Sequence, residues 1–287
     1  MSDFPSEWLA LREPVDHAAR SGALAARFAA ALGSSPRIID FACGTGSNLR
    51  YLSPRLGSEQ WWLCLDHDAS LLAVARDAIG TWGAARGLGP AGQGKALLEF
   101  QGAQARLKVA LIERDLRDPP RAFGVEGCDG ITASAFLDLV SAGWLDVFAR
   151  RVGAARLPVL LALTYDGRME WSPEQEEDRE IALRFNAHQC TDKGFGPALG
   201  PDASGYLAGL MEASGWRVQA SVSDWRLEAG HDAPLLNAFI EGVLGAAREV
   251  EDDPLLARWA ASRARDLSEG RLDLRVGHRD LLALPPD

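Results

Sequence analysis

The stretch Arg37-Ile38-Ile39-Asp40-Phe41-Ala42-Cys43-Gly44-Thr45-Gly46-Ser47 carries the clearest fold signal in the chain. Its first half is a short apolar run, which predicts a buried strand. Two closely spaced glycines follow, and then Leu49, Leu52 and Leu56 recur at helical spacing. Glycines at a strand-to-helix turn let a ligand approach the backbone, and the free N–H groups there favour an anionic group such as a carboxylate. The segment therefore predicts a ligand-binding turn.

Outward from this turn, short apolar runs alternate with segments of helical periodicity. Further strands are expected at 61–65, 95–101, 106–112, 130–133, 157–163 and 216–227, with a last pair at 271–276 and 280–284. Helices are expected near 14–32, 69–86, 136–151, 206–213, 234–249 and 254–267, another is expected to start at Ser172, and 87–94 reads as a glycine-rich loop. Strands that alternate with helices are typical of a doubly wound α/β sheet.

Three acids stand at the ends of three successive predicted strands. Asp40 precedes the glycine turn, Asp66 lies twenty residues after Gly46, and Asp115 follows the strand 106–112. An acid placed as Asp66 is can accept hydrogen bonds from both hydroxyls of a ribose. Asp115 can accept a hydrogen bond from an exocyclic amine such as adenine N6. The three acids and the turn together indicate a nucleoside-containing ligand.

These segments resemble the motifs of the class I S-adenosylmethionine-dependent methyltransferases. The matching stretches are Ile38–Gly46, Leu65-Asp66-His67-Asp68, Arg114-Asp115-Leu116 and Asp129–Ser134. The resemblance covers residues 20–165 well and 203–284 loosely. It implies a Rossmann-like, seven-stranded sheet with the last strand antiparallel, S-adenosyl-L-methionine as cofactor and S-adenosyl-L-homocysteine as product.

The resemblance also implies the cofactor site. Asp40, Gly44 and Gly46 would surround the methionine part, Asp66 the ribose and Asp115 the adenine. The full set of expected cofactor-binding residues is Arg20, Asp40, Ala42, Gly44, Thr45, Gly46, Asp66, His67, Asp115, Leu116 and Ala133. Ala42 stands where most members have glycine. A nicotinamide-dependent oxidoreductase is a rival interpretation, but its fingerprint needs a third glycine, and Leu49 occupies that position.

The whole chain, 1–287, is expected to form a single methyltransferase domain. Residues 1–35 would be an N-terminal helical cap, 165–205 a lid insertion, and 230–268 a helical insertion before the last strand. The acceptor would lie under the cap and the lid. The basic residues Arg12, Arg20, Arg184 and Lys193 suggest an acidic small-molecule acceptor.

The candidate catalytic residues are Tyr165, His188, Asp192 and Lys193. Tyr165 stands at the end of the fifth predicted strand, where ligands of open α/β sheets bind. His188 and Asp192 share a helical face with Ile181 if the helix persists. A histidine base suits a hydroxyl, so oxygen is the expected acceptor atom. A buried structural role for His188 stays open, and no third ligand completes a metal site.

The amino-acid composition argues against several classes of function. Of 287 residues, 47% are apolar and 24% charged, with a net charge of -10. This balance argues against nucleic-acid and anionic-membrane surfaces, which need clustered positive charge. No cysteine pair has metal-type spacing and no apolar run reaches membrane-spanning length. Without an apolar leader, we expect a cytoplasmic protein. A noncatalytic S-adenosylmethionine-binding protein is the alternative, and the oligomeric state is open.

Overall fold

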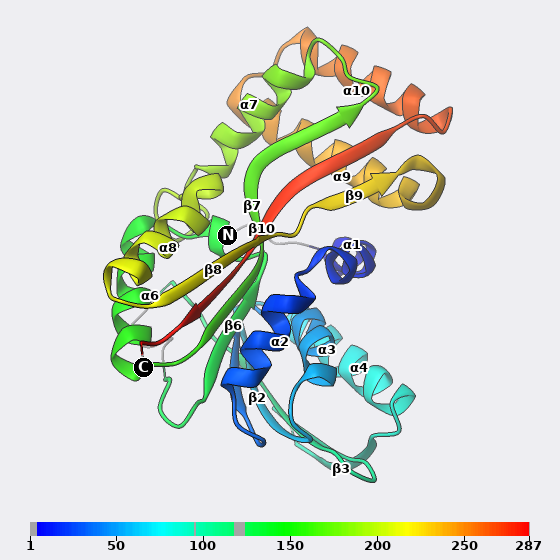
Figure 1. The fold of residues 1–287 in the computed structure, drawn as a ribbon. Coiled ribbons are helices and arrows are strands. Elements are labelled where there is room, and N and C mark those ends of the chain that lie inside the picture. The colour runs from blue at the N-terminus through cyan, green and yellow to red at the C-terminus, as the bar shows by residue number, and fades with distance from the viewer. Residues whose placement is uncertain (1–4, 95, 118–123, 287) are drawn as a thin grey trace.

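The computed structural model describes residues 5–94, 96–117 and 124–286. One central sheet has the strand order β3-β4-β5-β2-β1-β6-β7-β10-β8, and β9 pairs with β10 (Figure 1). The strands are β1 Arg37–Phe41, β2 Glu59–Asp66, β3 Gly89–Gln93, β4 Leu97–Gln101, β5 Arg106–Glu113, β6 Gly130–Ser134, β7 Val159–Ser172, β8 Arg217–Val222, β9 Trp225–Glu228 and β10 Asp273–Leu284. All the strands of the described residues belong to this one sheet.

Helices surround the sheet. They are α1 Ser6–Ala19, α2 Gly22–Ala31, α3 Ser47–Leu52, α4 Ala69–Ala85, α6 Ala142–Ala155, α7 Asp178–Gln189, α8 Ala203–Ala213, α9 Ala229–Val250 and α10 Pro254–Ser268, with short 3-10 helices η1 Ser53–Arg55, η2 Leu137–Leu139 and η3 Gly200–Asp202. None of the helices within the described residues combines the length and apolar character needed to cross a bilayer.

The doubly wound α/β fold is confirmed. Strands β5, β2, β1, β6 and β7 run parallel, and β10 runs antiparallel to both β7 and β8. Over the described residues the sheet has ten strands instead of the seven expected. One addition, β3, lies inside the predicted loop 87–94 and pairs antiparallel with β4. Its sequence, Gly-Pro-Ala-Gly-Gln, has no alternating apolar pattern that would predict a strand. The strand forms through backbone pairing with β4 at the edge of the sheet, which the sequence pattern does not reveal.

Two strands are longer than the sequence indicates. β7 continues to Ser172, where a helix was expected to start, and α7 begins only at Asp178. β10 is one strand rather than a pair, and β8 and β9 replace the single strand expected at 216–227. Pairing of β7 with β10 as far as Ser172 and Asp273 buries Trp171 and Leu274 in a shared apolar cluster. That tertiary burial overrides the local capping pattern at Ser172.

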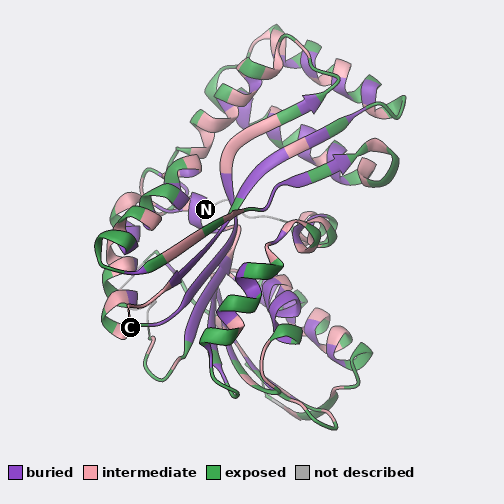
Figure 2. Ribbon diagram, viewed as in Figure 1, coloured by how far each residue is buried: buried purple, intermediate pink, exposed green. Residues whose placement is uncertain are grey.

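The core has three parts. One apolar cluster joins α2, α3 and α4 to one face of the sheet, and a second joins α6 and α8 to the other. The third fills the extension formed by β7, β10 and β9 under α7, α9 and α10 (Figure 1). Buried residues run along the central strands of the sheet and continue into the extension formed by β7, β10 and β9 (Figure 2). Helix α1 contacts β9 and α9, which places it beside the carboxyl ends of the central strands.

Candidate functional site

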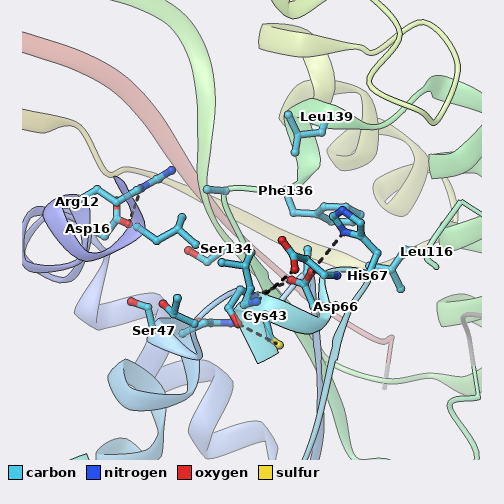
Figure 3. Close-up of a pocket in the computed structure, with 18 of the residues that line it drawn as sticks. Arg12, Asp16, Cys43, Ser47, Asp66, His67, Leu116, Ser134, Phe136 and Leu139 are labelled. Atoms are coloured by element: carbon cyan, nitrogen blue, oxygen red, sulfur yellow. Dashed lines mark hydrogen bonds and ion pairs between the residues drawn. The ribbon is translucent and has the colours of Figure 1, made fainter. Parts of the chain in front are cut away.

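A cavity lies at the carboxyl ends of the central strands. Residues 42–45 of the turn after β1, the residues at the end of β2 and those at the end of β6 all line it (Figure 3). Strand β1 pairs with β2 on one side and with β6 on the other, so the strand order reverses beside β1. Ligands of open α/β sheets bind at such a switch point.

The turn after β1 has an unusual backbone. Ala42, Gly44 and Gly46 have φ values of 49°, 52° and 78°, all in the left-handed region. Glycine adopts this region without strain, whereas alanine does not. A side chain at Gly46 would also collide with Ile79, because its Cβ would lie 2.9 Å from Ile79 Cδ1. The glycines therefore let α3 and α4 pack closely beneath the turn.

Asp66 fixes this turn to the end of β2. Its Oδ2 accepts a hydrogen bond from the Gly44 N–H at 2.8 Å, and its Oδ1 accepts one from the Asp68 N–H at 3.0 Å. His67 Nδ1 lies 3.3 Å from Asp66 Oδ1. Each carboxylate oxygen has two acceptor sites, so Asp66 can still accept hydrogen bonds from a ligand in the cavity.

A buried polar network supports the turn from below. Asn48 donates from Nδ2 to Asp40 Oδ1 at 2.6 Å and to Thr132 Oγ1 at 3.1 Å, and its Oδ1 accepts from Arg20 at 2.7 Å. Asp40 Oδ2 and the Arg20 Nε and Nη2 atoms have no hydrogen-bond partner. Burial raises the pKa of Asp40 to about 7 and lowers the pKa of Arg20. Asn48 thus bridges the buried carboxyl of Asp40 and the buried guanidinium of Arg20.

Helix α1 forms the opposite wall of the cavity. Arg12 donates from Nε to Asp16 Oδ2 at 2.8 Å, and Asp16 Oδ1 accepts from Trp225 Nε1 at 2.9 Å. Arg12 also lies over the Trp225 ring, with Cζ 4.9 Å from its centroid. Figure 3 shows Arg12 and Asp16 across the cavity from Asp66 and His67. The pair is therefore held against β9 while it faces the turn.

Seven of the residues expected in the site line the cavity: Ala42, Gly44, Thr45, Asp66, His67, Leu116 and Lys193. Arg20, Asp40 and Gly46 lie in or under the turn, and Ala133 is buried in β6. Asp115 is exposed and pairs with Arg117, whose guanidinium lowers the pKa of Asp115 to about 2. Five of these seven lining residues thus come from the turn and from the end of β2.

The other catalytic candidates lie outside the cavity lining. The Tyr165 hydroxyl donates to Asn186 Oδ1 at 2.8 Å, and His188 Nε2 lies 3.1 Å from Glu249 Oε2. Asp192 Oδ1 accepts the N–H groups of Gly194 and Gly196. The predicted shared helical face of His188 and Asp192 is wrong, because α7 ends at Gln189 and Asp192 follows in a loop.

Several cavity residues were not predicted: Leu9, Asp16, Ser47, Asn48, Asp68, Leu71, Ser134, Ala135, Phe136, Leu139 and Phe195. Some had a usable signal, because Asn48 follows the glycine turn and 134–139 follow the fourth strand of the resemblance. Leu9 and Phe195 lie within the expected cap 1–35 and lid 165–205, but nothing in the sequence singled out either residue, since their exact place depends on how remote segments pack.

No protein-family model and no curated protein sequence matches the chain. Solved structures do match its fold. A candidate methyltransferase from Bacillus halodurans is 14% identical, with 93% of this chain and 100% of that chain covered and a TM-score of 0.50. A cyclopropane synthase from Mycobacterium tuberculosis is 13% identical, with 98% and 95% covered and a TM-score of 0.50. The chain therefore has the Rossmann-like fold of the class I S-adenosylmethionine-dependent methyltransferases.

A further match is an S-adenosylmethionine-dependent methyltransferase from Geobacter sulfurreducens in complex with S-adenosyl-L-homocysteine. It is 14% identical, both chains are covered over 100% of their length, and the TM-score is 0.47.

Proposed function

We propose that this protein is an S-adenosylmethionine-dependent methyltransferase that acts on a small, acidic molecule at an oxygen atom. The observation that carries the proposal is the position of Asp66. Its carboxylate lies at the end of β2 in the same cavity as the glycine turn and bonds to the Gly44 N–H at 2.8 Å. The sequence motifs and the strand order support the same conclusion.

The residues present fit the cofactor. Asp66 retains acceptor capacity for ribose hydroxyls, and Leu71 and Leu116 supply apolar surface for an adenine. The left-handed Gly44 keeps the turn free of a side chain where a ligand approaches. Arg20 supplies a buried positive charge behind Asn48, with two guanidinium nitrogens lacking partners. These groups would hold the ribose, the adenine and the carboxylate of S-adenosylmethionine.

Bound S-adenosylmethionine would supply a methyl group on a sulfonium, whose sulfur is a good leaving group because it departs as a neutral thioether. The protein's own contribution is to position the acceptor and to exclude water. Phe136, Leu139 and Phe195 give the cavity an apolar wall, and Lys193 is the catalytic candidate that lines it. His188 lies behind Lys193, with Nδ1 3.3 Å from Lys193 Nζ. This arrangement suits an ionised acceptor oxygen, which needs no base in the cavity.

Calorimetric titration tests the cofactor. Wild-type protein should bind S-adenosylmethionine and S-adenosylhomocysteine with a micromolar Kd, about -8 kcal/mol, and should not bind NADH. Asp66→Asn should abolish binding, because it removes the charge that accepts the ribose hydroxyls. Asp77→Asn, an exposed acid on α4, is the matched control and should bind normally.

Both variants need thermal melts to show that they are folded. Folded wild-type protein that fails to bind either compound would refute the proposal. Binding without methyl transfer to any of a broad panel of carboxylates and phenols would favour the noncatalytic alternative.

A further inference from the structure

Lys193 is a buried cation in the cavity wall. The residue is 7% exposed, and it lies in the loop between α7 and η3. Its Nζ donates to Thr191 Oγ1 at 3.0 Å and lies 3.3 Å and 3.4 Å from the two ring nitrogens of His188. These partners are a hydroxyl and an imidazole, and neither is a carboxylate. They orient the ammonium without a direct negative partner.

The absence of a counterion distinguishes Lys193 from the other cation of the cavity. Arg12 forms an ion pair with Asp16 at 2.8 Å. Within the described ranges, by contrast, Lys193 forms no ion pair with a carboxylate, and the acid that acts on it from further away, Glu249, bonds to His188 instead. Burying a charge without a partner is costly, so an anion that enters the cavity would be stabilised there.

The surroundings of Lys193 are apolar. Phe136 and Phe195 line the same cavity, with ring centroids 5.6 Å apart at 78°, and Leu139 and Leu9 lie in the lining with them. Trp144 packs against both phenylalanine rings, so their positions are fixed from behind. An apolar wall next to one buried cation is complementary to a ligand that has an apolar body and one negative group.

We propose that Lys193 binds the carboxylate of the methyl acceptor, whose apolar body packs against Phe136 and Phe195. The inference rests on the proposed function, and it names the acceptor class: a monocarboxylate with an apolar aliphatic or aromatic part. Lys193 donates to the carboxylate, while His188 and Thr191 orient its ammonium. Lys193 is thereby a specificity-determining residue.

The test measures binding and needs no turnover. Protein saturated with S-adenosylhomocysteine is titrated calorimetrically with butyrate, phenylacetate and indole-3-acetate, and with the primary amide of each. The amides keep the shape and lose the charge. At least one carboxylate should bind about tenfold more tightly than its amide, as expected for a hydrogen bond to a charged group. Lys193→Gln should reduce that preference to less than about threefold.

Two further variants keep the test interpretable. Lys108→Gln removes an exposed lysine on β5 and should leave the preference intact. Lys193→Arg keeps the charge and should retain a preference for the carboxylate. Thermal melts of the S-adenosylhomocysteine complex show that each variant is folded.

Equal affinity for acid and amide in the wild-type protein would overturn the inference. So would a preference that survives in folded Lys193→Gln, or no carboxylate binding at millimolar concentration. These outcomes leave the proposed function standing when S-adenosylhomocysteine itself binds. Failure of S-adenosylhomocysteine to bind would overturn the proposed function, and this inference with it.

Discussion

Asp40 should make the unliganded protein lose stability as the pH rises. Its side chain is fully buried, Oδ2 has no partner, and burial raises its pKa to about 7. In the unfolded chain the pKa returns to about 4. Between these two values the unfolded state releases a proton that the folded state keeps. Unfolding therefore becomes easier with each pH unit until both states are ionised above pH 7.

The magnitude follows from the pKa difference. Each unit corresponds to about 1.4 kcal/mol, and the folded-state carboxyl is half ionised at pH 7, so the wild-type protein should lose about 2 kcal/mol from this group between pH 5 and pH 7. Asp40→Asn keeps the shape of the side chain and cannot ionise. The free energy of unfolding of the variant relative to wild type should therefore rise by about 2 kcal/mol over the same range.

Urea unfolding of the two proteins at half-unit steps between pH 5 and pH 8 measures this difference. Other titrating groups cancel in the comparison unless they couple to Asp40. Asp77→Asn, whose carboxylate is exposed, should give a difference that stays flat with pH. A flat difference for Asp40→Asn as well would refute the reasoning, since it would mean that Asp40 ionises normally inside the fold.

Three other changes have defined outcomes. Asp280 is 1% exposed and accepts the N–H groups of Ser21 at 2.7 Å and Leu163 at 2.9 Å. Asp280→Ala should lower the free energy of unfolding by about 3–5 kcal/mol, measured in urea, and a loss under about 1 kcal/mol would contradict this role. Burial lowers the pKa of His278 to about 3, so protonation of this group in the unfolded state should cost the wild-type protein about 2 kcal/mol between pH 6.5 and pH 5. The free energy of unfolding of His278→Gln relative to wild type, measured in urea, should therefore rise by about 2 kcal/mol as the pH falls over that range, and a flat difference would contradict this role. Ala42→Val should cost about 1–3 kcal/mol because φ is 49°, and it should weaken S-adenosylhomocysteine binding in calorimetry, whereas unchanged stability would show that the turn relaxes.

The part of the cavity formed by the glycine turn and the end of β2 could largely be predicted from the sequence. Strand β1, the glycine turn and Asp66 depend on signals within a few residues: an apolar run, two glycines and an acid at a strand end. The part of the cavity near Lys193 could not be predicted in the same way. Lys193 was one of four catalytic candidates and is the only one of them that lines the cavity, and the helical face assigned to His188 and Asp192 assumed a helix that ends at Gln189.

The sequence by itself determined the α/β class, the parallel central strands and the glycine turn after β1, because hydrophobic period and glycine conformation act locally. The tertiary structure alone decided the length of β7 and β10, the edge strand β3, and which charged residues meet at the cavity. Arg12 reaches it from α1, Lys193 from the loop after α7, and Asp66 from β2. These side chains come together through the packing of segments far apart in the chain, and no local pattern encodes that packing.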